Sequence, residues 1–359
     1  MRPYLSVRIL DAQNPRDKES VIYTGIHRPL LLLCVAASAR AQPAIRVAPD
    51  TFWNTLWRGH PVVARIKPGD IVMTKLLDAG ARDDRNILRA QPSNPMVGPF
   101  YIEGAEPGDA IAVNFRKIRP NRGTAWSYYR LGLFSLTGSA IEGLYPNVYK
   151  PDLVRPGRSD LLVWDVDTLR GMVKLREPVS ARHRLEFPME PMLGVVGVAP
   201  AGDFAPTSGP SREYGGNMDF NEIREGSTLL LPVFNPGALL FLADGHALMA
   251  DGEPTGAGIE TSMNVEFSVD LKKKGGLTGP RVITRDYIIS VGSQAEFIST
   301  LDRAVQLATS DMVRWLTEEY GMEPWAAHML IGAKGEYEVV TVMGSAALKI
   351  AKRWLPSSQ

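Results

Sequence analysis

Short apolar segments introduced by Pro-Gly or Glu-Gly dipeptides recur along the chain and constrain its fold more than any other feature. They are KPGDIVMTK (67–75), EPGDAIAVNF (106–115), REGSTLLLP (224–232) and NPGALLFLA (235–243). Proline presets the φ of a turn's second position and glycine accepts the positive φ of the third, so Pro-Gly predicts a tight turn. In the second segment, Ile111, Val113 and Phe115 alternate with smaller or polar residues, which is typical of a half-buried strand.

Two further stretches extend this pattern along the chain. NVEFSVDL (264–271) alternates in the same way, and the unbroken apolar run LLFL (239–242) predicts a strand that is buried on both faces. Many short strands separated by regular turns predict a mainly β fold with a β-sandwich or barrel-like core.

The C-terminal part has a different pattern. Ser293–Glu296 reads as a capping box, and apolar residues over 297–316 recur at spacings of three and four. This predicts a long amphipathic helix that begins at the capping box and ends near Gly321. A second helix is expected to begin at Pro324 and a strand to follow at 336–343, which makes a smaller α+β C-terminal portion.

The segment HRPLLLLCVAASARAQP (27–43) has the positive entry, short apolar run and small-residue exit of a signal peptide. We expect cleavage near Ala41. The chain then divides into a signal peptide with an over-long start (1–41), an N-terminal β-rich region (42–200) and a C-terminal region that carries most of the site (201–359). The alternative interpretation of the segment 27–43 is a buried core strand or helix. Because the apolar run is too short to span a bilayer, we expect a periplasmic or secreted protein without membrane insertion after signal cleavage.

Composition and cysteine content exclude several classes of function. The 359 residues are 45% hydrophobic and 22% charged, with a formal net charge of +1. Phosphate binding usually needs a basic excess, so no nucleic acid partner is expected. The only cysteine, Cys34, lies in the signal segment, so the mature chain is expected to have neither a disulfide nor a thiol nucleophile. The motifs of α/β-hydrolases and dinucleotide-binding folds do not occur either.

The run LADGHALMADGEPTGAGIE (242–260) concentrates acidic residues, glycines and a histidine. Asp244 and His246 end an apolar strand at a spacing of two, so their side chains are expected to face the same side. Such a pair suits a borderline divalent metal such as zinc, and the alternative is an Asp–His hydrogen bond that stabilises a turn. Asp251 and Glu253 fit either the same site or a solvated turn, and Glu260 follows shortly after them.

A second candidate is YGGNMDF (214–220), in which Gly215 and Gly216 precede Asn217 and Asp219. The two polar side chains again face one side, and the alternative is an Asx-type turn. Any metal site must rely on carboxylates, because beyond the signal segment the histidines are only His60, His183, His246 and His328.

Taken in order, several motifs resemble those of the acetamidase/formamidase family. They are GPFYIEGAEPGD (98–109), PMLGVVGVAP (191–200), GGNMD (215–219), LPVFNPGAL (231–239), and ADGHALMADGE (243–253) with GIE (258–260). The resemblance implies a β-rich fold with an α+β portion and hydrolysis of the C–N bond of small linear amides such as acetamide or formamide, with release of ammonia. It also implies a divalent metal, zinc by preference, and a homo-oligomer.

The residues that match the family motifs are Asn217, Asp219, Asp244, His246, Asp251, Glu253 and Glu260. We hypothesise that Asp219, Asp244 and His246 hold the metal, with Asn217 orienting or completing the ligand set. Glu260 is the expected base, and Glu253 orients the site or exchanges roles with it. Gly215, Gly216 and Asp251 are expected to shape the site.

The chain departs from the family pattern at several positions. Ala243 and Ala250 replace glycines, Met249 replaces a glutamine, and Phe52 stands where a histidine is usual, with His60 the nearest histidine. The added Cβ groups are expected to change the shape of the pocket. Two alternative functions remain, namely hydrolysis of a lactam or other cyclic amide, and a periplasmic binding protein that has lost catalysis.

Overall fold

The computed structural model describes residues 44–128, 135–140, 161–177, 182, 184–293 and 300–356. The expected signal peptide (1–41) with Cys34, and His183, lie outside the described residues. Gln42–Gln359 form one compact unit, and both of its sheets take strands from either side of residue 200. The regions 42–200 and 201–359 therefore share one body.

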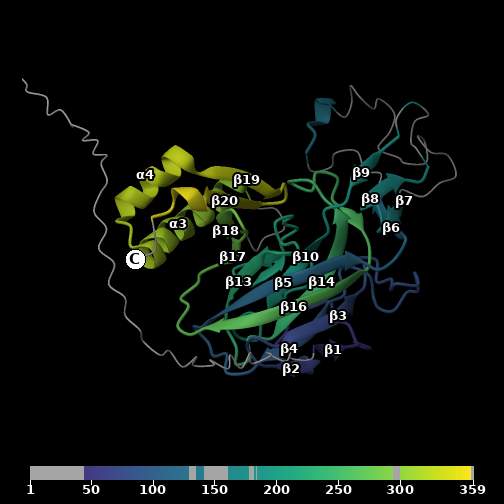
Figure 1. Cartoon of the computed structure of the whole chain (residues 1–359), viewed down its shortest axis with the longest axis horizontal. Helices are drawn as coiled ribbons and strands as arrows, with labels where there is room; N and C mark the ends of the chain where they lie inside the picture. Colours follow the sequence, from purple (N-terminus) through teal and green to yellow (C-terminus); the bar gives the residue numbers. More distant parts are fainter. Residues whose placement is uncertain are drawn as a thin grey trace, which may run out of the picture. The chain divides into compact units, whose positions relative to one another are not determined.

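The first sheet has nine strands and runs through the middle of Figure 1. Its order is β1 (Ile45–Val47), β3 (Ile71–Leu76), β16 (Met263–Lys272), β5 (Ala110–Pro120), β13 (Thr228–Pro232), β17 (Arg281–Ile283), β18 (Tyr287–Gly292), β20 (Ser345–Ala351) and β19 (Glu336–Thr341). Its neighbouring strands are antiparallel, except that β1 and β3 are parallel.

The second sheet has eleven strands. Its main path is β11 (Ser211–Arg212), β12 (Gly215–Asn217), β10 (Met192–Val198), β14 (Leu240–Leu248), β15 (Ile259–Glu260), β6 (Thr124–Tyr128), β7 (Leu161–Asp167), β8 (Met172–Leu175) and β9 (Glu186–Pro188). Off this path, β4 (Val97–Ile102) pairs with β14, and β2 (Ala64–Ile66) pairs with β4. The main apolar core joins residues of both sheets, and the rings of Phe100 on β4 and Phe267 on β16 lie 5.3 Å apart edge to face.

The turns predicted from the Pro-Gly and Glu-Gly dipeptides are confirmed. Gly69, Gly108, Gly226 and Gly237 have φ of +88°, +91°, +86° and +78°, the region that glycine enters without steric cost. Each turn is followed by its predicted strand, namely β3, β5, β13 and β14. The side chains of β14 are buried from Leu240 to Ala247, as the unbroken apolar run predicts. The prediction of a mainly β fold is therefore confirmed.

Two helices, α3 (Leu301–Tyr320) and α4 (Pro324–Lys334), and a short 3-10 turn, η1 (Lys352–Trp354), make up the smaller helical part near the C-terminus. Helix α3 ends at Gly321, with φ of +64°, as predicted. It begins at Leu301, after an extended Thr300 and later than predicted. Gln294–Glu296 of the predicted capping box lie outside the described residues. Ser293 of the predicted capping box directly follows β18, and its buried hydroxyl accepts a hydrogen bond from Ser345.

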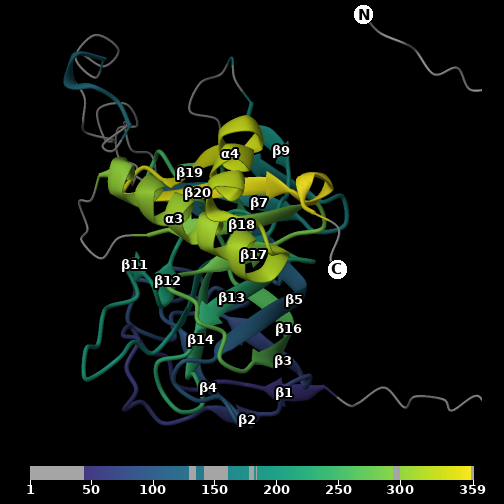
Figure 2. The same cartoon turned by 90° about the vertical axis from the view of Figure 1, so that its left-hand side faces the viewer.

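Helix α3 packs on the β18–β20 part of the first sheet, as Figures 1 and 2 show. The contact is apolar around Met312, Trp315 and Leu316, which meet Leu348 and Ile350 of β20. Among the described residues, neither helix combines the length and the apolar composition that a bilayer span requires.

An ion pair is buried under α3. The carboxylate of Asp311 on α3 accepts hydrogen bonds from Nε and Nη2 of Arg281 on β17 at 2.7 and 3.0 Å. The guanidinium of Arg281 also lies 4.7 Å from the ring centre of Trp315. Both charged side chains are almost inaccessible to solvent, at 1% and 8% exposure.

Asp311→Asn is expected to lower the free energy of unfolding by about 3–5 kcal/mol, because it removes the buried partner of a buried guanidinium. Arg281 then keeps only the partly exposed carboxylate of Glu319, 3.6 Å from its Nη1. Urea denaturation followed by circular dichroism measures the change. The control is Asp165→Asn, because Asp165 is half exposed in its pair with Arg176, and an exposed pair contributes little. If both variants lose the same free energy of unfolding, burial does not set the strength of the Asp311–Arg281 pair.

Candidate active site

Strand β14 carries two of the sequence-predicted ligands, Asp244 and His246, in the middle of the second sheet. Gly245, between them, pairs with Leu193 of β10. Asp244 has a φ of +60°, an unusual backbone conformation for a residue with a side chain. Both side chains are buried, with His246 fully inaccessible. The continuous apolar sequence before Asp244 therefore places the two polar groups inside the protein, and not on a solvated turn.

Gly194 of β10 makes room for the carboxylates. A Cβ atom at this position would overlap Oδ2 of Asp244 and Oδ1 of Asp219. The backbone N–H groups of Met218 and Asp219 also donate to the carbonyl oxygen of Gly194, at 3.0 and 3.2 Å. The role of this residue was not foreseen, although a glycine inside an apolar strand is a known signal of close approach by other groups.

Glu260 meets His246 across the strand pair β14–β15. Its Oε2 lies 3.1 Å from Nε2 of His246, and Oδ1 of Asp244 lies 3.4 Å from the same nitrogen. The other carboxylate oxygen of Glu260 accepts a hydrogen bond of 3.0 Å from the backbone N–H of Gly258. Gly258 also leaves space for the imidazole, because a Cβ there would lie 2.9 Å from Nδ1 of His246. On its other side, Glu260 pairs with Trp126 of β6, a strand that was not predicted.

Asp219 and Glu253 complete the cluster from loops. Both have positive φ, +47° and +45°. One ligand atom each from Asp219, His246 and Glu253 lie within 4.8 Å of one another, and the same holds for Asp244, His246 and Glu260. We call these five residues the carboxylate–histidine cluster. Asn217 donates a side-chain hydrogen bond to Oδ2 of Asp219, which orients that carboxylate.

The residues predicted to shape the site lie around the carboxylate–histidine cluster. Gly215 and Gly216, with φ of +80° and +96°, let β12 run close to its neighbours, because a Cβ at Gly215 would overlap the carbonyl oxygen of Val196. Asp251 is exposed and lies outside the two ligand groups, and its Oδ1 accepts a hydrogen bond of 2.6 Å from Nδ2 of Asn221. Asp251 therefore contacts the loop that carries Asn221, and it is not a member of either ligand group.

Of the departures from the family pattern, Ala243 directly precedes Asp244 on β14. Ala243 is buried in the main apolar core, and Ala250 is exposed. His60 stacks on the ring of Trp53 at 4.0 Å, and its Nε2 lies 2.8 Å from Oγ1 of Thr55. His60 thus belongs to an aromatic cluster of the N-terminal part.

Several buried atoms of the carboxylate–histidine cluster make no hydrogen bond of good geometry, although Nε2 of His246 lies 3.1 Å from Oε2 of Glu260. Among the described residues they include Oδ1 of Asp219, Oδ1 of Asp244, both ring nitrogens of His246 and Oε2 of Glu260. Buried polar atoms without partners are costly and call for an explanation. Four carboxylates and one imidazole that converge in this way offer the oxygen and nitrogen donors, and the negative charge, that a divalent metal such as zinc requires. The residues present therefore fit a divalent cation.

Burial also changes the protonation of the cluster. It raises the pKa of Glu260 to about 8 and the pKa of Asp219 to about 7, and it raises the pKa of Glu253 well above its usual range. Burial alone would lower the pKa of His246, but the carboxylates of Glu260 and Asp244 outweigh it and raise that pKa. Conversely, His246 lowers the pKa of Asp244 despite its burial. The protein by itself holds protons here at neutral pH, and a divalent cation would release them on binding.

A separate cavity of about 930 Å³ lies beside β1, β3 and β16, and its lining includes none of the five cluster residues. Its basic side chains Lys75, Arg89 and Lys117 pair with Asp84, Asp83 and Glu266 at 2.6, 2.6 and 2.9 Å. These three basic side chains are therefore paired with neighbouring carboxylates, and Arg46, Arg119 and Asp50 also line the cavity.

Comparison with known proteins relates this site to enzymes. The model of the Acetamidase/Formamidase family matches residues 198–336. The acetamidase of Mycolicibacterium smegmatis is 28% identical over 270 residues, which cover 60% of this chain and 64% of that protein. The matched region thus spans less than two thirds of that relative.

Solved structures extend the likeness over most of the fold. The crystal structure of acetamidase from Yersinia enterocolitica superposes with a TM-score of 0.72 at 28% identity, covering 90% of this chain and 96% of that one. The acetamidase from Bacillus halodurans superposes with a TM-score of 0.69 at 26% identity, covering 86% of this chain and 98% of that one. The family model spans all five residues of the carboxylate–histidine cluster, and together with the solved structures it supports membership of the Acetamidase/Formamidase family.

Proposed function

We propose that the carboxylate–histidine cluster hydrolyses the C–N bond of small linear amides of the acetamide and formamide kind, and releases ammonia. The observation that carries this proposal is the convergence of Asp219, Asp244, His246, Glu253 and Glu260. Among the described residues, several of their buried oxygen and nitrogen atoms make no hydrogen bond of good geometry. The names of the relatives, acetamidase and formamidase, support the same class of substrate.

A divalent ion, zinc by preference, would be held by Asp244, His246 and Glu260, with Asp219 as a further ligand oriented by Asn217. Bound there, such an ion supplies a Lewis acid that polarises the amide carbonyl and makes water easier to deprotonate. Glu260 is assigned as a ligand because its Oε2 lies 3.1 Å from Nε2 of His246 and its other oxygen is held by Gly258. This exchanges the roles that the sequence suggested for Glu260 and Glu253.

Glu253 is the proposed base. It is the member of the cluster that is partly exposed, whereas the other four are buried. Burial raises the pKa of its carboxyl, which makes the carboxylate a stronger base. Glu253 takes a proton from the attacking water, whose oxygen bonds to the carbonyl carbon. The C–N bond then breaks as the same proton passes to the nitrogen, which leaves as ammonia.

The experiment is to purify the protein, measure its metal content, and assay ammonia release from formamide, acetamide and a γ-lactam. We expect bound zinc, release of ammonia from the linear amides, loss of activity after chelation, and recovery when zinc is added. Full activity in protein stripped of metal would exclude the metal-dependent reaction. Hydrolysis of the lactam alone would move the substrate to cyclic amides, and a ligand-induced thermal shift without any hydrolysis would indicate a binding protein.

A further inference from the structure

Two members of the carboxylate–histidine cluster, Asp219 and Glu253, lie on loops and not on strands. Each has the left-handed backbone conformation that side chains disfavour, with φ of +47° and +45°. Such conformations persist only where surrounding contacts hold them. The contacts that hold these two loops therefore decide whether Asp219 and Glu253 reach His246 together.

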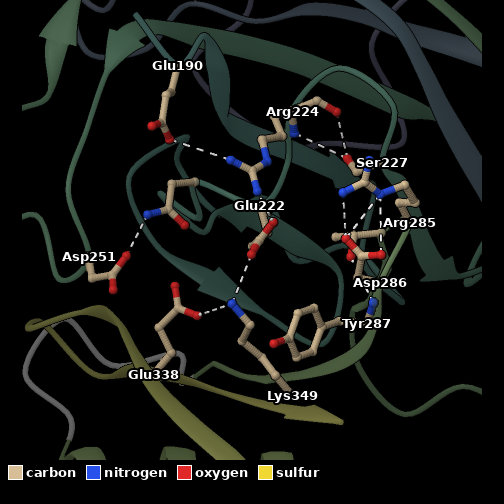
Figure 3. Close-up of polar contacts among 12 residues, drawn as sticks. Glu190, Glu222, Arg224, Ser227, Asp251, Arg285, Asp286, Tyr287, Glu338 and Lys349 are labelled. Atoms are coloured by element: carbon tan, nitrogen blue, oxygen red, sulfur yellow. Dashed lines mark hydrogen bonds and ion pairs between the residues drawn. The ribbon is translucent and has the colours of Figure 1, made fainter. Parts of the chain in front are cut away.

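The loop of Asp219 is attached to the C-terminal hairpin β19–β20 through Glu222. This residue lies three positions after Asp219, and its Oε1 accepts a hydrogen bond of 2.9 Å from Nζ of Lys349 on β20. Its Oε2 accepts a second one, also of 2.9 Å, from Nη2 of Arg224. Figure 3 shows the side chain of Lys349 reaching from β20 to Glu222.

The loop of Glu253 is attached to the same hairpin by its backbone. Gly252 donates to the carbonyl oxygen of Val340 at 3.2 Å, and its own carbonyl oxygen accepts from the N–H of Val342 at 2.9 Å. The two loops also contact each other directly, because Nδ2 of Asn221 donates to Oδ1 of Asp251 at 2.6 Å. The hairpin is thus the common support of both loops.

Lys349 lies between carboxylates of the loop and of the hairpin. Its Nζ is 2.9 Å from Glu222 and 3.0 Å from Glu338 of β19, and it lies 5.0 Å from the ring centre of Tyr287. The side chains of Lys349, Glu222 and Glu338 are only 16%, 10% and 11% exposed. Burial opposes the charged ammonium, but the two carboxylates outweigh it and raise the pKa of Lys349. In Figure 3 the three groups form one continuous chain of contacts.

We propose that Lys349 is a positioning residue for the metal centre, a step that rests on the proposed function. Its ammonium holds the Glu222 loop against the hairpin that supports Glu253. Without it, Glu222 and Glu338 are two nearly buried carboxylates on the same side of the hairpin, and their repulsion moves the loop away. Asp219, on that loop, then leaves the position at which it meets His246 and Glu253.

The test compares Lys349→Met with Lys349→Arg. Methionine keeps a long side chain but removes the charge, and we expect the dissociation constant of zinc to rise by about 10- to 100-fold. We expect kcat to fall in parallel while KM changes little, because Lys349 does not touch the substrate. Lys349→Arg keeps the positive charge and is expected to recover most of the zinc affinity and most of kcat. The affinity for zinc is measured by competition with a fluorescent chelator, independently of activity, and thermal unfolding is recorded for each variant.

The matched control is Lys272→Met, which breaks the pair of Lys272 with Glu319 (2.6 Å), away from both loops. It is expected to keep the zinc affinity and kcat of the parent. A folded Lys349→Met protein with a zinc affinity within about two-fold of the parent's would overturn the proposal. So would a loss of the same size in Lys272→Met.

If Lys349→Met does not fold, Glu222→Gln takes its place, because it keeps the length of the side chain and removes the charge that holds the loop. Weaker zinc binding in this variant supports the proposal, and unchanged binding overturns it. A parent protein that binds no zinc would instead contradict the proposed function, and the assignment of Lys349 would fall with it.

Discussion

Glu253→Gln is expected to lower kcat for amide hydrolysis by about 10²- to 10⁴-fold, the range that a positioned acid–base group contributes. Glutamine has the length of glutamate but cannot take a proton from water or return it to the leaving nitrogen. Because Glu253 is on a loop and partly exposed, its replacement leaves Asp244, His246 and Glu260 in place. Zinc content, measured by mass spectrometry of the purified protein, is therefore expected to stay at the level of the parent.

Glu260→Gln provides the comparison, because Glu260 is buried against His246. It is expected to lose zinc as well as activity, since a neutral amide is a poorer ligand than a carboxylate. If Glu260→Gln keeps its zinc and loses kcat, while Glu253→Gln keeps its activity, the base is Glu260 and the sequence-based assignment was right. The two variants together separate the roles of proton transfer and metal binding.

Gly194→Ala is expected to reduce kcat by about 10²-fold or more and to weaken zinc binding, although it adds only a methyl group. The new Cβ would overlap a carboxylate oxygen of Asp244 and one of Asp219. Both groups must move, and a displacement of about 1 Å in an active site is enough for a loss of this size. Steady-state assays of ammonia release and the zinc content measure the effect, and circular dichroism checks that the fold is retained.

Gly123→Ala is the matched control for this variant. Gly123 precedes β6, and a Cβ atom there would meet nothing within 4 Å. It is expected to keep parental activity, so that the comparison isolates contact with the carboxylates from the general effect of replacing a glycine. Parental kcat and zinc content in Gly194→Ala would show that Asp219 and Asp244 do not occupy the positions on which the proposed function depends.

Patterns confined to a few neighbouring residues predicted their elements well. The dipeptides before β3, β5, β13 and β14 predicted the turns, because the positive φ of a turn favours glycine wherever the turn lies in the fold. The end of α3 at Gly321 follows from the same rule. The predicted start of α3 was too early, because α3 begins at Leu301 after an extended Thr300.

The sequence by itself determined the mainly β class, the turns and the set of polar residues that converge, because each depends on local backbone preferences or on motifs of adjacent residues. Only the tertiary structure decided which of these residues meet. Strand pairing places Glu260 against His246 and Gly194 beneath Asp244. A loop that packs against the β19–β20 hairpin brings Glu222 to Lys349, which follows it by 127 positions. Contacts between strands depend on register across the whole sheet, and no short stretch of sequence contains that information.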